Sequence, residues 1–419
     1  MMHSGLMKDM SMKHGSLLVG VDIGTTKVCA VVGEMSGKGS AVNVIGVGTS
    51  PSAGLKKGVV TDIDQTVGAI RKAVREAEAM AGVEIRAAQI GITGGHISSL
   101  SSNGIIAVKE KEIGRREIDS VVEAAKAVAI PFDREILHVI PTGFTVNGQN
   151  GIMDPSGMRG VRLETKVQII TGAATSVHNL TNSCQKAGLE HLDIVFQPLA
   201  AANAVLTRDE KDLGTVLIDI GGGTTDIAFF KDGKICHSAV LPVGGNNFTN
   251  DIAIGLRLST QEAENIKKRF GCSRISLVKE DEEIEVSSPD SVANKKIPRR
   301  YLVEILQPRA EELFGLIREE LLNSGLKESM SSGAVITGGA VLMEGMDVMA
   351  ENILELPVRI GVPERVGSAK VNIKGPAYSS AVGLMLHGVK EIPAEQESKK
   401  KNAAGTGSKV KRWFGRMFE

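Results

Sequence analysis

Short runs of apolar residues that end at a polar turn recur along this chain, and they predict buried strands. Residues 17–22 form the first run, which ends in Asp22 and a Gly-Thr turn, and residues 28–32 form the second. Two apolar runs on either side of a glycine-containing turn predict a hairpin around Gly24, and residues 42–47 extend the same sheet.

The pattern changes to a helical one between residues 62 and 81. Apolar residues recur on one face from Ile63 to Val74, Asp62 stands where a helix is capped, and Gly82 follows where a helix ends. A further strand is predicted at residues 88–93.

Residues 214–230 repeat the opening pattern of apolar strand, aspartate, glycine-rich turn, threonine and apolar strand. Asp219 ends the first of these strands, as Asp22 does in the earlier hairpin. An internal repeat of one strand–turn–strand unit indicates duplicated domains around a shared site.

The segment from about residue 96 to 165 differs from its surroundings. Strand-like runs at 104–108 and 136–145 flank a charged helical stretch at about 117–128, which is typical of a small inserted α/β module. From residue 166 the first pattern resumes, with a strand predicted at 167–171.

Composition narrows the function classes. A chain of 419 residues is too long for one ordinary core. With 49 basic and 49 acidic residues the net charge is zero, which argues against a nucleic-acid binder. The four cysteines share no C-x-x-C spacing and are interpreted as reduced thiols, and no structural metal is predicted.

The two repeated turns carry candidate chemistry for a polyphosphate. Glycines let backbone N–H groups approach an anion, threonine hydroxyls add donors, and Asp22 and Asp219 are placed to hold Mg²⁺ through water. A third strand runs through a Gly-Gly pair into an expected helix, whose N-terminus would suit a phosphate. The candidate nucleotide-binding residues of the three segments are Asp22, Gly24, Thr25, Thr26, Lys27, Gly221, Gly222, Gly223, Thr224, Thr225, Gly338 and Gly339. Any one segment could be a plain tight turn, but three in this order favour a nucleotide site.

These segments resemble the phosphate and adenosine loops of the actin, Hsp70 and sugar-kinase superfamily. The resemblance implies an α/β actin-like ATPase fold, in which two duplicated lobes enclose a nucleotide cleft, and it implies ATP with Mg²⁺ as ligands. Residues 197–202 and 377–383 are similar to its connecting helices. Gln197 then occupies the position that orients attacking water, and Glu264 and Lys267 occupy positions that contact ribose and adenine. A solvated helix face remains the alternative for Glu264 and Lys267.

Within that superfamily the chain from residue 17 to 419 is similar to the FtsA family of bacterial division proteins. The motifs that carry the resemblance are residues 20–27, 91–96 and 221–226, together with the C-terminal segment. The resemblance implies an adaptor that polymerises like actin, anchors the FtsZ ring to the inner face of the cytoplasmic membrane at the septum, and helps recruit later division proteins. FtsZ would bind residues 244–305, and the later proteins would bind the inserted module.

The same resemblance gives the expected domain division. It comprises a disordered leader (1–15), a first lobe called 1A (16–95 with 166–205 and 372–390), the inserted module 1C (96–165), a second lobe called 2A (206–243 with 306–371), subdomain 2B (244–305), a flexible linker (391–408) and a terminal amphipathic helix (409–419).

The C-terminal segment has the pattern of a membrane-binding helix. Its apolar residues are spaced so that they would lie along one face of a helix, and they are Val410, Trp413, Phe414, Met417 and Phe418. Its basic residues, mostly on the other side, are Lys409, Lys411, Arg412 and Arg416. Such a helix suits an anionic lipid surface. Docking onto its own core or a partner groove remain alternatives, and the linker argues against the first.

Two other functions belong to the same superfamily. A small-molecule kinase or phosphatase would need a catalytic base and substrate cleft, for which no second carboxylate motif is evident. An Hsp70-type chaperone would need a large substrate domain after the ATPase, whereas only about thirty residues follow the last core element. We therefore expect ATP to be a structural and switching ligand with at most slow hydrolysis.

Overall fold

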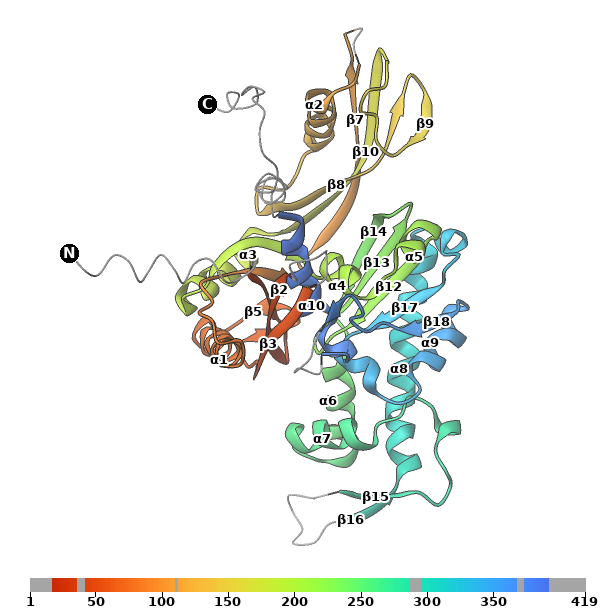
Figure 1. Cartoon of the computed structure of the whole chain (residues 1–419). Helices are drawn as coiled ribbons and strands as arrows, with labels where there is room; N and C mark the ends of the chain where they lie inside the picture. Colours follow the sequence, from red (N-terminus) through yellow and green to blue (C-terminus); the bar gives the residue numbers. More distant parts are fainter. Residues whose placement is uncertain (1–16, 36–41, 110–111, 287–294, 368–372, 392–419) are drawn as a thin grey trace, which may run out of the picture.

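The computed structural model describes residues 17–35, 42–109, 112–286, 295–367 and 373–391. Two β-sheets form the body, and helices α4 (Gln197–Val205) and α10 (Ser379–His387) pack between them (Figure 1). One apolar core joins the two lobes, because Val31, Ala201, Leu217 and Val382 lie in the same buried cluster.

The first lobe contains a six-stranded sheet in the order β11-β6-β1-β2-β3-β19. Its strands are β1 (Leu17–Ile23), β2 (Lys27–Met35), β3 (Val42–Pro51), β6 (Ala87–Ile92), β11 (Glu190–Phe196) and β19 (Val366–Gly367). The predicted hairpin is confirmed, with Asp22 opposite Cys29 in an antiparallel pair. The expected domain division places residues 366–367 in the second lobe, but β19 pairs with β3 of the first-lobe sheet.

Helix α1 (Ile63–Ala81) is confirmed with both of its predicted ends. The Asp62 carboxylate accepts a hydrogen bond from the Gln65 amide at 3.0 Å, and Gly82 adopts φ 69° at the other end. Helix α3 (Ala174–Ala187) and the short strands β4 (Leu55–Lys56) and β5 (Val59–Val60) complete this lobe.

The second lobe repeats the hairpin. Its sheet has the order β14-β13-β12-β17-β18, and Asp219 stands opposite Asp226 in the antiparallel pair of β12 and β13. The strands are β12 (Thr215–Ile220), β13 (Thr225–Lys231), β14 (Lys234–Leu241), β17 (Ala334–Thr337) and β18 (Val358–Ile360). The helices of this lobe are α5 (Arg208–Leu213), α8 (Arg299–Asn323) and α9 (Met346–Leu354).

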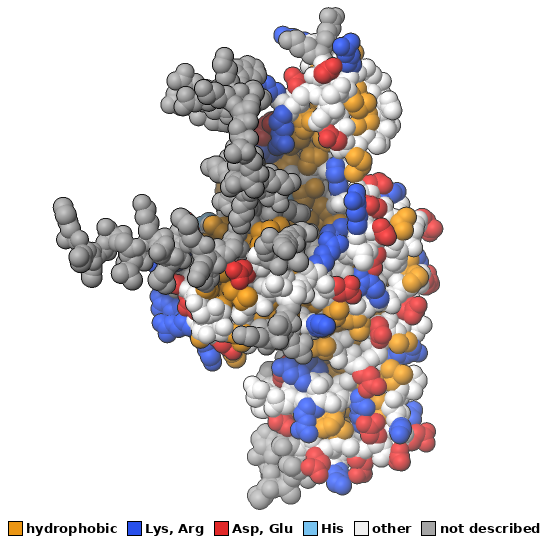
Figure 2. All heavy atoms as spheres, viewed as in Figure 1, with side chains coloured by type: hydrophobic (Ala, Val, Ile, Leu, Met, Phe, Trp, Pro, Cys, Tyr) orange, Lys and Arg blue, Asp and Glu red, His pale blue; other side chains and the backbone are white. Residues whose placement is uncertain are grey.

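Residues 244–286 and 295–298 extend from the second lobe, away from the inserted module (Figure 1). They comprise α6 (Gly245–Leu256), α7 (Thr260–Phe270), β15 (Glu283–Val286) and β16 (Lys295–Pro298). Figure 2 shows acidic and basic side chains interspersed over this part of the face drawn.

The inserted module has its own four-stranded sheet in the order β7-β10-β8-β9, covered by helix α2. Its elements are β7 (Ser98–Ala107), α2 (Arg115–Lys126), β8 (Arg134–Val146), β9 (Gln149–Ile152) and β10 (Arg162–Ala173). The strand expected at 167–171 is therefore the second half of β10, and it pairs with β7 rather than with the first-lobe sheet. The boundary expected at residue 165 falls inside this strand. Residues 163, 165 and 167 are all buried and alternate with more exposed neighbours, so the strand pattern continues through residue 165 and nothing local marks the change.

Single-turn 3₁₀ segments fill the connections. They are Ile275–Leu277, Lys327–Ser329, η3 (Gly339–Leu342), Pro376–Tyr378 and Gly388–Glu391. Among the described residues, no helix is both long enough and apolar enough to cross a membrane. The expected leader, the terminal helix and all but the first residue of the linker lie outside the described residues.

Candidate functional site

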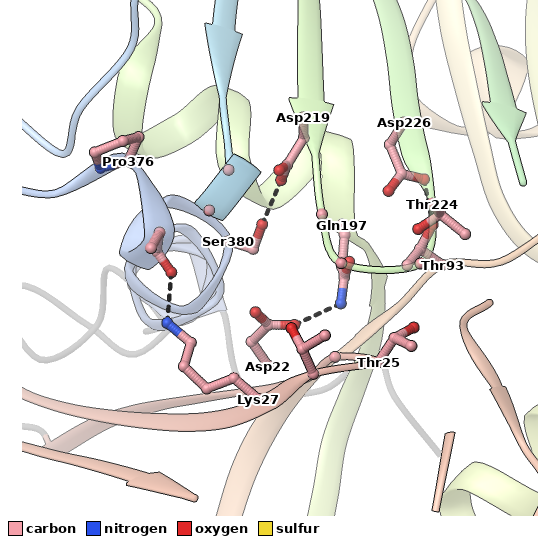
Figure 3. A pocket seen from close by; sticks show the side chains of 18 residues that line it. Asp22, Thr25, Lys27, Thr93, Gln197, Asp219, Thr224, Asp226, Pro376 and Ser380 are labelled. Atoms are coloured by element: carbon pink, nitrogen blue, oxygen red, sulfur yellow. Dashed lines mark hydrogen bonds between the residues drawn. The ribbon is translucent and has the colours of Figure 1, made fainter. Parts of the chain in front are cut away.

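The three segments singled out from the sequence converge on one cavity between the lobes (Figure 3). Its volume is about 100 Å³. Its lining residues are Asp22, Gly24, Thr25, Thr26, Lys27, Thr93, Gln197, Asp219, Gly221, Gly222, Gly223, Thr224, Asp226, Gly338, Gly339, Pro376, Ala377 and Ser380.

The turns of the two hairpins face each other across this cavity. A Cβ atom on Gly223 would lie 2.7 Å from Thr25 Oγ1, and one on Gly222 would collide with the Thr26 side chain. Only glycine permits this approach, so the glycine run serves the contact between turns as well as the turn itself.

Three aspartates stand around the cavity, and each accepts a side-chain hydrogen bond. Asp219 and Asp226 are buried, and Asp22 is partly buried. Gln197 Nε2 donates to Asp22 Oδ1 at 2.6 Å, and Ser380 Oγ donates to Asp219 Oδ2 at 2.7 Å (Figure 3). The Thr93 hydroxyl donates to Asp226 across the two lobes.

Burial raises the pKa of all three carboxyl groups, because it disfavours their charged form. The pKa of Asp22 rises to about 7, since the favourable charge of Lys27 only partly offsets burial and Asp219 adds repulsion. A divalent cation or its hydrated shell would supply the positive charge that this cluster lacks.

Lys27 extends along the cavity wall. Its Nζ donates to the Ala377 carbonyl at 2.8 Å and lies 4.5 Å from the centre of the Tyr378 ring. These contacts hold the ammonium group at the junction of β2 with the segment that leads into α10.

Gly338 directly follows β17 and has φ 94°, and a Cβ atom there would collide with Asp219. The helix expected directly after Gly338 and Gly339 does not begin there. A four-residue 3₁₀ turn, η3, follows instead, and α9 begins only at Met346. Met343 is extended, with ψ 132°, and Gly345 has φ 80°, so the backbone leaves the helical conformation between η3 and α9.

Three expected site residues do not line the cavity. The Thr225 hydroxyl is buried and donates to the Val243 carbonyl at 2.8 Å. Glu264 and Lys267 form an ion pair of 2.7 Å on α7, and Lys267 Nζ donates to the Gly245 carbonyl at 2.9 Å. The Gly245 amide donates a hydrogen bond to the Gly221 carbonyl, so Gly245 links the Glu264–Lys267 pair to the second turn.

The site list from the sequence omitted Thr93, Asp226, Pro376, Ala377 and Ser380. Asp226 could have been found, because it ends the second glycine-rich motif opposite Asp219. Ser380 is 161 residues from its partner, and no local signal marks it.

No group of three or more His, Cys, Asp or Glu side chains is arranged to hold a metal ion within the part of the chain that is described. An ion bound beside Asp22 and Asp219 would therefore need water or phosphate oxygens as further ligands.

Two lobes with duplicated hairpins around one cleft define an actin-like protein, and solved structures share this fold. The PilM–PilN type IV pilus biogenesis complex has a chain that superposes with a TM-score of 0.66 at 18% identity, covering 89% of this chain and 98% of its own. MreB5 of Spiroplasma citri bound to ADP gives a TM-score of 0.53 at 18% identity, covering 92% and 98%.

The family model "Cell division protein FtsA" matches residues 216–383, and "SHS2 domain inserted in FTSA" matches residues 94–171. Cell division protein FtsA of Pseudomonas aeruginosa is 43% identical, over 97% of this chain and all of its own length. The Bacillus subtilis protein of the same name is 42% identical over 89% of this chain and 84% of its own. The chain belongs to the FtsA family of cell division proteins.

Proposed function

We propose that this protein binds Mg²⁺–ATP between its lobes, polymerises in an actin-like way and anchors FtsZ to the cytoplasmic membrane at the division septum. The observation that carries the nucleotide part is the convergence of Gly338 and two turns, each containing aspartate, glycine and threonine, on one cavity. The fold neighbour MreB5 has been crystallised with ADP and with AMPPNP, which supports the same ligand class here.

The residues present fit such a ligand. Backbone N–H groups of the two glycine turns and the Thr25, Thr26 and Thr224 hydroxyls would bind phosphate oxygens, and Lys27 would supply positive charge. Asp22 and Asp219 would hold Mg²⁺ through water, and the bound ion would neutralise phosphate charge. Glu264 and Lys267 lie beyond the second turn, where ribose and adenine would extend.

Hydrolysis would be slow at most. Gln197 is proposed to orient a water molecule, but its amide is already bonded to Asp22. The side chain would have to release that carboxylate before it could position water.

Nucleotide binding is tested with a fluorescent ATP analogue. Lys27→Ala should weaken binding about tenfold, because a charge-assisted contact to phosphate is lost. Lys72→Ala, on the exposed face of α1, is the matched control and should bind as the wild type does. Equal affinity of all three proteins would contradict the site.

The membrane part of the proposal depends on residues 409–419, which lie outside the described residues. Full-length protein should carry FtsZ to the top of a gradient with anionic vesicles, and protein truncated before Lys409 should not. Full-length protein that remains in the soluble fraction would contradict the anchor.

The proposed FtsZ surface lies on residues 244–305. Ile254 is 78% exposed, and it borders a cavity between α6 and α8 that Ile305 and Pro308 also line. We expect Ile254→Ser to weaken FtsZ binding in a pull-down assay. Leu322→Ser, an equally apolar exposed position at the other end of α8, should not.

The family resemblance also implies that later division proteins bind the inserted module and that copies of this chain assemble into filaments. Exposed apolar side chains at Ile105, Phe132 and Val161 give the module surface for such contacts.

A further inference from the structure

Strand β11 lies at the edge of the first-lobe sheet, and its last residue sits directly before the candidate site. Phe196 pairs with Ile92 of β6 on one side and is fully buried. A buried N–H on the free side of an edge strand needs a partner. The inserted module supplies it: His138 of β8 accepts a hydrogen bond from the Phe196 amide at Nε2, at 2.9 Å.

Packing and strand pairing hold His138 in place for this hydrogen bond. In the module, His138 stands opposite Ile170 in the pairing of β8 with β10. Its neighbours Leu137 and Ile140 pack against the buried cores of the body. Burial lowers the pKa of His138 to about 4, so the imidazole is neutral near pH 7 and Nε2 is free to accept.

The residue after Phe196 is Gln197, whose side chain donates to Asp22 in the cavity. The residue that bonds His138 and the residue that bonds Asp22 are therefore adjacent in the chain, joined by one peptide unit. A shift of β8 relative to β11 would move the Phe196 amide, and the rigid helix start at Gln197 and Pro198 would follow.

A second connection runs along the strands that join the module to the body. The Arg134 guanidinium on β8 donates to the His96 carbonyl at 2.9 Å and to the Thr171 carbonyl at 3.0 Å. Three residues before His96, Thr93 reaches into the cavity and bonds Asp226. The module thus contacts both segments that lead into the site.

We infer that His138 is a positioning residue that couples the orientation of the inserted module to the nucleotide in the cleft, through the Phe196 amide and Gln197. The inference rests on the proposed nucleotide site. By linkage the coupling is reciprocal: a partner that fixes the module changes nucleotide affinity, and nucleotide changes affinity for that partner.

Amide hydrogen exchange of the full-length chain, with and without Mg²⁺–ATP, tests this inference. In the wild type, nucleotide should slow exchange in residues 22–27 and also in β8, the latter by about fivefold or more, the lower end of typical couplings. His138→Leu keeps the volume but has no acceptor, so β8 should no longer respond while residues 22–27 still do. His138→Gln retains an acceptor and should restore the response of β8.

Two further variants make the comparison specific. His178→Leu, an exposed histidine on α3, is the control and should behave as the wild type. If His138→Leu does not fold, His138→Asn replaces it, because that amide is polar but too short to reach Phe196.

The possible results separate the two proposals. Protection of residues 22–27 with an unchanged β8 response in His138→Leu, or with no β8 response in the wild type, overturns the coupling and leaves the nucleotide site standing. No protection of residues 22–27 by nucleotide in the wild type overturns the nucleotide site and the coupling together.

Discussion

Asp22, Asp219 and Asp226 place three carboxyl groups around one cavity, and each accepts a hydrogen bond from a different segment. Burial and mutual repulsion make their ionisation costly in the free protein. The charged forms of these carboxyl groups therefore lower the stability of the free protein, and a bound cation, as proposed, would offset this cost.

Asp22→Asn should raise the melting temperature of the nucleotide-free protein at pH 8. The pKa of Asp22 is about 7 in the folded state and about 4 when unfolded. The folded state therefore binds the proton more tightly, and this part of the stability is present below pH 4 and lost as the pH rises through 7. When the pH is lowered from 8 to 6, the wild type should gain stability because Asp22 takes up a proton. Asp22→Asn should gain less.

Thermal melts across that pH range check this prediction. Asp281→Asn, at an exposed position, is the control and should leave the pH dependence as it is in the wild type. An unchanged pH dependence in Asp22→Asn would show that Asp22 does not titrate in this range.

At the residue level, sequence reasoning found the parts of the site that repeat. Asp22 and Asp219 were predicted because each ends an apolar strand before a glycine turn, and both line the cavity. Thr225 was chosen for its hydroxyl, but in a strand alternate side chains point to opposite faces, and this one points to Val243. Ser380 depends on how α10 packs, which one sequence does not reveal.

Among the elements, those with their own start and stop signals were predicted well. Helix α1 has a capping aspartate and a terminal glycine, and both of its ends agree. The domain boundary expected at residue 165 has no such signal. It falls within β10, a single strand that pairs with β7 and β8 of the module along its length. The turn after Gly338 was expected to be a helix, since the apolar run 340–343 does not distinguish a 3₁₀ turn from an α-helix.

The cap of α1 gives a prediction at this scale. Asp62→Ala should lower the free energy of unfolding by about 1 kcal/mol, because the Gln65 amide loses its acceptor. Asp62→Asn retains an oxygen at the cap and should be close to the wild type. Denaturant titrations followed by circular dichroism measure both, and equal losses in the two variants would argue against capping as the cause.

Across the whole molecule, the two lobes come into close contact at the cavity. The cavity measures about 100 Å³, whereas ligand pockets are commonly about 300–1,000 Å³. The facing turns contact each other at Thr25 and Gly223. We therefore predict that Mg²⁺–ATP, if it binds as proposed, moves the lobes apart.

Labels on cysteines at positions 72 and 351, on α1 of the first lobe and α9 of the second, should report a longer distance by energy transfer when Mg²⁺–ATP is added. Both positions are exposed, and a Cys236→Ser background removes the one native thiol that is not buried. A pair at positions 72 and 190, both in the first lobe, should not change. A constant distance in the first pair would contradict separation of the lobes.

The packing of α10 between the lobes has a consequence for synthesis on the ribosome. Roughly 180 residues separate β11 from α10, although both belong to the first lobe. At about 5–20 residues per second, the groove that α10 fills stays open for roughly 10 to 40 seconds after β11 has emerged. A nascent chain in that interval has both glycine turns but no Ser380, so Asp219 has no donor from α10 until that helix has emerged.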